Sequence, residues 1–133
     1  MDLPPELADH FNRIGIEALS LAESDDDRVL LYAEVTEDTE NAFVRYARRN
    51  DRKFQCAADL EGVPDALRDA WEFSRSLGAE HAWTAVVYRI NDRKISVDLL
   101  YANDVDLNAS MYDKEEKLLE KHYPGMEFEE DCG

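Results

Sequence analysis

Hydrophobic residues recur at two different periods along the chain, which separates the expected helices from the expected strands. Spacings of three and four residues predict helices over residues 5–22, 62–77 and 111–122. Short segments rich in β-branched and aromatic residues predict strands over 28–36, 41–48, 53–57, 83–90 and 94–101. This order predicts one α+β domain over residues 1–133, with an antiparallel sheet of about five strands (two hairpins plus a short strand) packed with about three helices. We expect residues 126–133 to form an acidic, flexible tail.

The second predicted hairpin has a definite register, because a tight polar turn at residues 91–93 joins two alternating segments. The expected core face carries Val86, Tyr88, Ile90, Ile95, Val97, Leu99 and Tyr101. The opposite face carries Trp83, Ala85, Val87 and Leu100 beside Arg89, Ser96 and Asp98. That face is apolar at one end and polar at the other, so we expect it either to be partly covered by another element or to associate with another surface.

The last predicted helix is mainly polar. Its main apolar positions are Met111, Leu118 and Leu119, with Tyr112 as a further candidate. Its other positions alternate in charge, with Lys114, Lys117 and Lys121 among Glu115, Glu116 and Glu120. This alternation predicts a solvated face with local ion pairing.

The net charge of the chain limits the classes of molecule that we expect it to bind. The chain has 31 Asp and Glu against 15 Lys and Arg, a formal net charge of −16. This charge disfavours binding to nucleic acid or to anionic lipid, and favours a basic partner. No apolar run is long enough to span a bilayer, and the first residues lack the features of a secretory signal. We therefore expect a cytoplasmic protein whose Cys56 and Cys132 are free thiols.

The charge is distributed unevenly along the chain. Residues 1–40 contain 12 acidic and 2 basic side chains, a net charge of −10. Residues 98–131 contain 11 acidic and 3 basic side chains, a net charge of −8. Between them, residues 45–53 contain five basic side chains and one acidic side chain, a net charge of +4. The acidic segments also contain tyrosines, and tyrosine among carboxylates is typical of a surface that binds a basic protein.

Catalytic and metal-binding motifs are absent from the sequence. His10, His81 and His122 are not spaced as zinc ligands, and Asp25-Asp26-Asp27 lacks the spacing of a calcium loop. No nucleophile elbow, phosphate-binding glycine loop or nucleotide fingerprint occurs. We expect no metal, no cofactor and no enzymatic activity.

Three segments together resemble the YezG-like antitoxin family. They are Leu31-Tyr32-Ala33-Glu34-Val35-Thr36 before an acidic turn, Ala82-Trp83-Thr84 before a hairpin that closes with Val97-Asp98-Leu99-Leu100-Tyr101, and a final helix with Glu116, Leu119, His122, Tyr123, Pro124 and Gly125. The resemblance covers roughly residues 5–125. Leu100, where a polar or acidic residue is expected, and the basic Arg48-Arg49 pair depart from the family's pattern. The resemblance implies an immunity protein that occludes a co-produced toxin, in the described cases a nuclease.

Charge and resemblance together predict a surface that binds a basic toxin. The residues expected to contribute are Tyr32, Glu34, Glu37, Asp38, Asp98, Tyr101, Asp104 and Asp106. Two alternatives stay open. One is an acidic DNA mimic or adaptor that binds a host regulator, and the other is a small-molecule-binding or enzymatic α+β domain with a pocket lined by Trp71, Trp83 and Tyr88.

Overall fold

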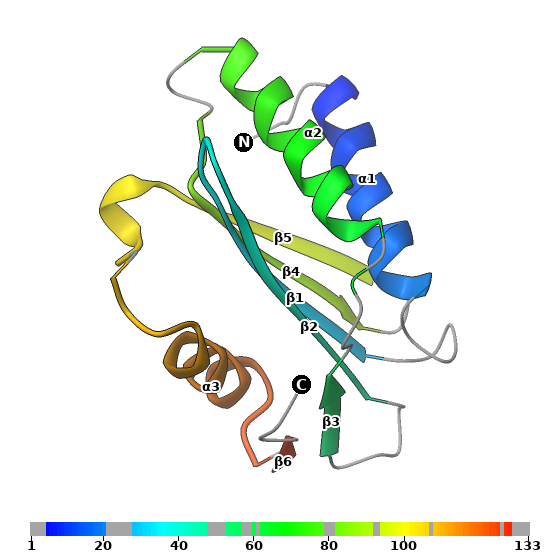
Figure 1. Cartoon of the computed structure of the whole chain (residues 1–133). Coiled ribbons are helices and arrows are strands. Elements are labelled where there is room, and N and C mark those ends of the chain that lie inside the picture. Colours follow the sequence, from blue (N-terminus) through cyan, green and yellow to red (C-terminus); the bar gives the residue numbers. More distant parts are fainter. Residues whose placement is uncertain are drawn as a thin grey trace.

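The protein is an α+β structure built on one sheet whose four long strands are antiparallel (Figure 1). The computed structural model describes residues 5–20, 28–47, 53–56, 60, 62–78, 82–91, 94–106, 108–125 and 127–128. The helices are α1 (Pro5–Ser20), α2 (Val63–Ser76) and α3 (Met111–His122), with a short 3-10 helix η2 (Ala102–Asp104). The strands are β1 (Arg28–Val35), β2 (Glu40–Ala47), β3 (Lys53–Cys56), β4 (Ala85–Asn91), β5 (Lys94–Leu100) and β6 (Glu127–Phe128).

The strand order among the described residues is β5-β4-β1-β2-β3-β6. The four long strands β5, β4, β1 and β2 form the antiparallel body, one fewer than the predicted five, because β3 pairs with β2 through only two residue pairs. Both predicted hairpins are present. Glu127–Phe128, within the expected tail, pairs in parallel with β3, while residues 126 and 129–133 lie outside the described part.

Helices cover both faces of the sheet. Figure 1 shows α1 and α2 side by side on one face and α3 on the other. The central strand β1 is buried on both sides: Leu31 and Ala33 belong to the core under α1 and α2, while Leu30 and Tyr32 belong to a second core under α3. A strand covered on both faces reads as an almost continuous hydrophobic run, which is the pattern of β1.

The first core follows from the helical spacing of its residues. Leu7, Phe11, Ile14 and Ala18 form one stripe on α1, and all four are buried. The hydroxyl of Tyr88 donates to the carbonyl of Phe11 at 2.9 Å, so α1 lies directly against β4. Gly15 permits this approach, because a Cβ there would stand 2.3 Å from the Tyr88 oxygen.

The predicted register of the second hairpin is confirmed, with Tyr88 opposite Val97 and Ile90 opposite Ile95. The position predicted for Trp83 is wrong. A bend at Thr84 precedes β4, so the alternation of the strand does not extend to Trp83. Its ring lies in the core under α1 and α2, where its Nε1 donates to Ser74 Oγ at 2.8 Å.

The second sheet face is partly covered, as predicted: α3 packs over Ala85, Val87 and Leu100, while Ser96 and Asp98 stay exposed. Leu119 of α3 is buried there, with Leu118 and Met111 packed around it. The main apolar residues predicted for α3 are therefore those that contact the sheet. Two charged residues of α3 face the sheet as well: Lys114 forms an ion pair with Glu34 of β1, and Glu115 with Arg45 of β2.

No helix in the described part of the chain is long and apolar enough to cross a membrane.

Candidate binding surface

The turn between β1 and β2 presents two of the predicted site residues, Glu37 and Asp38, both exposed. The turn is closed locally, because the Thr36 amide donates to the Thr39 carbonyl at 2.9 Å and the Thr39 amide donates to Thr36 Oγ1 at 3.2 Å. Its backbone conformation is therefore held without help from the two acidic side chains.

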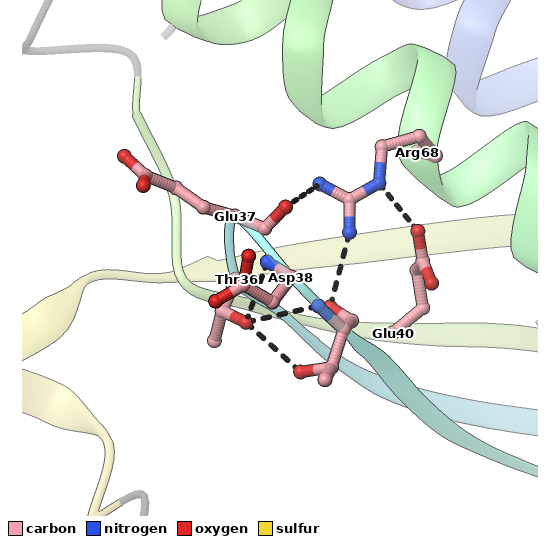
Figure 2. Close-up of polar contacts among 6 residues, drawn as sticks. Thr36, Glu37, Asp38, Glu40 and Arg68 are labelled. Carbon is pink, nitrogen blue, oxygen red and sulfur yellow. Dashed lines mark hydrogen bonds and ion pairs between the residues drawn. The ribbon is translucent and has the colours of Figure 1, made fainter.

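Arg68 of α2 contacts the backbone of this turn (Figure 2). Its guanidinium donates to the carbonyls of Glu37, at 3.5 Å, and Thr39, at 3.2 Å, and it forms an ion pair with the Glu40 carboxylate. The Glu37 carboxylate extends away from Arg68 (Figure 2). Arg68 thus fixes the backbone of the turn and leaves the acidic groups of Glu37 and Asp38 on the outside.

A second arginine of α2 lies next to the turn. Arg75 forms an ion pair with Glu37 at 3.4 Å, but the side chains are 45% and 76% exposed, so this pair neutralises Glu37 weakly. Arg68 and Arg75 both stack on Trp71, at 5.0 and 4.6 Å from the ring centre. Neither arginine was predicted as part of the surface. Their spacing around Trp71, three residues before and four after, places all three on one helix face and was the available signal.

The segment after β5 presents the second group of carboxylates. Asp104 and Asp106 are exposed, and Tyr101 is half-buried. Asp104 accepts from the amide of Tyr101 at 3.2 Å, and Asp106 accepts from the amide of Asn108 at 3.0 Å. These contacts orient the carboxylates without supplying a counter-charge.

Both segments leave the sheet at the same end. The amide of Val35 donates to the Thr84 carbonyl, and the amide of Thr84 donates to the Leu100 carbonyl, so β1 and β5 end beside the start of β4. The two chain exits are separated by one strand, about 10 Å. We name the four exposed carboxylates Glu37, Asp38, Asp104 and Asp106 the sheet-end surface.

Asp98 lies inside β5, on the α3 side of the sheet. Its carboxylate is 58% exposed and lies 4.0 Å from Arg89. It is accessible, as predicted, but it belongs to the strand and not to the sheet-end surface.

Tyr32 and Glu34 are not surface residues, although both were predicted as binding residues. They are 3% and 4% exposed. The Tyr32 hydroxyl donates to Glu34 Oε2 at 2.6 Å, and Lys114 of α3 forms an ion pair with the same carboxylate. Burial, with the neighbouring Glu34 carboxylate, raises the pKa of Tyr32. Both residues face the underside of α3, because even-numbered positions of β1 point away from α1 and α2.

A second buried ion pair joins α3 to the sheet. Arg45 Nε donates to Glu115 Oε2 at 2.9 Å and Arg45 Nη2 donates to Glu115 Oε1 at 2.8 Å, with the Arg45 side chain completely buried. The prediction of a solvated charged face on α3 is therefore wrong for Lys114 and Glu115. Arg45 is likewise not part of an exposed basic segment. Arg48, Arg49 and Arg52 lie outside the described residues, as do Cys132, His81 and the side chain of Cys56.

At the other end of α3, His122 and Tyr123 lie near Arg89 of β4. Burial, together with Arg89 and Lys121, lowers the pKa of His122. Tyr123 donates to Asn91 Oδ1 at 2.8 Å and packs against Phe54, and burial raises the pKa of Tyr123. These contacts hold α3 in place and explain the aromatic end of this helix.

The aromatic residues proposed to line a pocket are instead used in the core. Trp71 Nε1 donates to the Trp83 carbonyl at 3.1 Å, while Trp83 and Tyr88 donate to Ser74 and Phe11. Since every polar group of these rings has a protein partner, none of them points to a ligand. Within the described ranges, no group of three or more His, Cys, Asp or Glu side chains is arranged to hold a metal ion.

No protein-family model matches this chain, and a search of curated proteins finds no match either. The resemblance to the YezG-like family stays a prediction from the sequence.

Proposed function

We propose that this protein is a cytoplasmic immunity protein that binds and occludes a basic toxin through the sheet-end surface. The family resemblance implies that this toxin is a nuclease. The observation that carries the proposal is the convergence of exposed carboxylates from two separate segments, the β1–β2 turn and the segment after β5, at one end of the sheet. The proposal needs no catalytic residue, because a bound inhibitor stops a toxin by covering its substrate site.

The physical basis is charge complementarity. A nuclease attracts phosphates with a basic cleft, and a row of carboxylates on a rigid turn presents a similar charge. The chain's net charge of −16 accelerates the encounter, while the local arrangement of the carboxylates selects the partner. Arg68 supports this role, since it fixes the turn before binding and so reduces the entropy that binding must remove.

The proposal predicts a basic toxin domain encoded beside this gene, and the test measures the nuclease activity of that domain with increasing amounts of this protein. A surface variant carries Glu37→Gln, Asp38→Asn, Asp104→Asn and Asp106→Asn. A control variant carries Glu6→Gln, Asp9→Asn, Asp65→Asn and Glu72→Gln, four exposed carboxylates of α1 and α2. Both variants lose four negative charges, so they differ only in position.

We expect the wild type and the control variant to inhibit at a one-to-one ratio, and the surface variant to require at least tenfold more protein. Equal inhibition by the two variants would show that the sheet-end surface is not the interface. Absence of inhibition by the wild type, with binding to a host regulator instead, would favour the adaptor alternative.

A further inference from the structure

The edge strand β5 has an apolar face that α1 and α2 leave partly open. Ile95, Val97 and Leu99 point to the same side of the sheet as the core under these helices. Ile95 is 46% exposed, whereas Val97 and Leu99 are half-buried. Among the described residues, β5 has a strand neighbour only on its β4 side, so its other edge presents backbone donors and acceptors.

The flank of α1 above this edge is uncharged. One side of α1 contacts α2 through the His10–Phe73 ring contact and the Arg13–Asp69 ion pair. The opposite flank carries Ala8, Asn12, Ile16 and Leu19. Ile16 is 68% exposed. The helix α1 packs against β4, and β5 is the strand next to β4 at the edge of the sheet. This flank of α1 therefore lies beside β5. An uncharged, apolar strip is therefore present on a chain whose net charge is −16.

The sequence of β5 is self-complementary in an antiparallel pairing. If two copies pair about Val97, then Val97 faces Val97 of the second copy, and Ile95 faces Leu99. On the other face of the sheet, Ser96 faces Asp98, and Lys94 lies diagonal to Asp98 of the second copy, within reach of a long side chain. In this register Lys94 itself faces Leu100 of the second copy, so apolar residues are aligned on one face and opposite charges are placed diagonally on the other.

The β5 edge also lacks the usual protection against pairing. It is seven residues long, roughly 24 Å, and contains no proline. Its one lysine, Lys94, lies at the end of the strand, where the proposed register gives it an acidic partner. We propose that β5 is the interface of a twofold symmetric homodimer, in which the sheets of two copies join edge to edge and the uncharged flanks of α1 approach each other.

This inference does not depend on the proposed toxin binding, because Asp98 and the β5 edge are outside the sheet-end surface. The two interactions respond to salt in opposite directions. Added salt screens the repulsion between two copies of charge −16 and favours the dimer, whereas it weakens attraction to a basic partner. Failure of one proposal therefore leaves the other testable.

The experiment is sedimentation equilibrium of the full chain over a range of concentrations, in about 0.1 M and about 1 M salt. The wild type should approach twice the chain mass of 15.3 kDa, at lower concentration in the higher salt. Val97→Lys places two lysines directly opposite each other and should raise the dimer dissociation constant at least tenfold. Ile95→Lys should act in the same direction at a site that is already exposed, so its folding is not at risk.

Leu77→Lys is the matched control, because Leu77 is 37% exposed at the end of α2 and lies outside the proposed interface. It should leave the dimer unchanged. A wild type that stays monomeric in both salts would overturn the proposal, as would an unchanged dimer in Ile95→Lys.

A charge exchange tests the register itself. Lys94→Glu and Asp98→Lys should each weaken the homodimer, because each brings like charges together across the edge. A mixture of the two variants should form a heterodimer. In that heterodimer the introduced glutamate of one variant lies near the introduced lysine of the other, while the native Asp98 of the first lies near the native Lys94 of the second. If the mixture associates no better than either variant alone, this register is wrong.

Discussion

Arg45 on β2 and Glu115 on α3 form a bidentate ion pair that is buried between the sheet and the helix. Beside it, Glu34 on β1 pairs with Lys114, so two adjacent residues of α3 meet opposite charges on two adjacent strands. These two pairs join α3 to the sheet in addition to the apolar contacts of Met111, Leu118 and Leu119. They also assign to the fold several charged residues that the sequence suggested for solvent or for a partner.

Replacing Glu115 with alanine should destabilise the protein by about 3–5 kcal/mol, because it removes the carboxylate that accepts two hydrogen bonds from the fully buried Arg45 guanidinium. Glu116→Ala, at the exposed neighbouring position, should change the free energy of unfolding by less than about 0.5 kcal/mol. Urea denaturation measures both. An equal effect of the two substitutions would contradict the buried pair.

Gly15→Ala should also be destabilising, although alanine is the better helix former. The helix gains about 1 kcal/mol from the substitution, while forcing a methyl group into a packed site costs about 1–3 kcal/mol. The new Cβ would meet the Tyr88 hydroxyl, which cannot move without losing its bond to Phe11. In a Tyr88→Phe background the cost of Gly15→Ala should therefore shrink. An identical cost in both backgrounds, measured by thermal unfolding, would rule out this contact as its cause.

The protein should lose stability in alkaline solution. Burial raises the pKa of Tyr88 from 10.0 to about 12, and burial also raises the pKa values of Tyr32 and Tyr123. Above pH 10 the unfolded tyrosines release their protons while the folded ones keep them, so the unfolded state is favoured increasingly until the folded pKa is reached. Tyr88 alone accounts for a loss of roughly 2–3 kcal/mol by pH 12. Urea midpoints that stay constant between pH 9 and about 11.5 would contradict this account.

Arg68→Ala should loosen the β1–β2 turn and lower stability by about 1–2 kcal/mol, because its guanidinium contacts two backbone carbonyls and the Glu40 carboxylate. Hydrogen exchange at the Thr39 amide should accelerate. Arg75→Ala is the control, since Arg75 also stacks on Trp71 but pairs with the exposed Glu37 side chain, whereas Arg68 binds the backbone of the turn. If both substitutions accelerate exchange equally, stacking on Trp71 is the dominant contribution of both arginines.

The parts of the fold that depend on local periodicity were predictable. The register of β4 and β5 follows from the alternation of apolar residues on either side of the polar segment 91–93, and the face of α1 follows from the helical spacing of Leu7, Phe11, Ile14 and Ala18. The predicted position of Trp83 is wrong, because alternation holds only inside a strand and the bend at Thr84 ends it. The pairing of β6 with β3 joins residues about seventy positions apart, and no local pattern indicates such a contact.

The candidate site was predictable only in part, because residue type alone does not say whether a position lies in a turn or in a covered strand. Glu37, Asp38, Asp104 and Asp106 are exposed as expected, since they lie outside the sheet, in the β1–β2 turn and in the segment after β5. Tyr32 and Glu34 lie inside a strand that is covered on both faces. Glu115 lies four residues after Met111 and four before Leu119, on the apolar stripe of α3. This spacing was the available sign that its carboxylate faces the sheet.

The binding proposal is tested by the association rate constant with the basic toxin domain that it predicts beside this gene, measured at about 0.05 M and about 0.5 M salt. For the wild type and the Glu6, Asp9, Asp65 and Glu72 control variant, we predict a fast rate at low salt that falls at least tenfold at high salt. For the Glu37, Asp38, Asp104 and Asp106 surface variant, we predict a slow rate at low salt and a much weaker salt dependence. Equal rates for the two variants at both salt concentrations would contradict binding through the sheet-end surface.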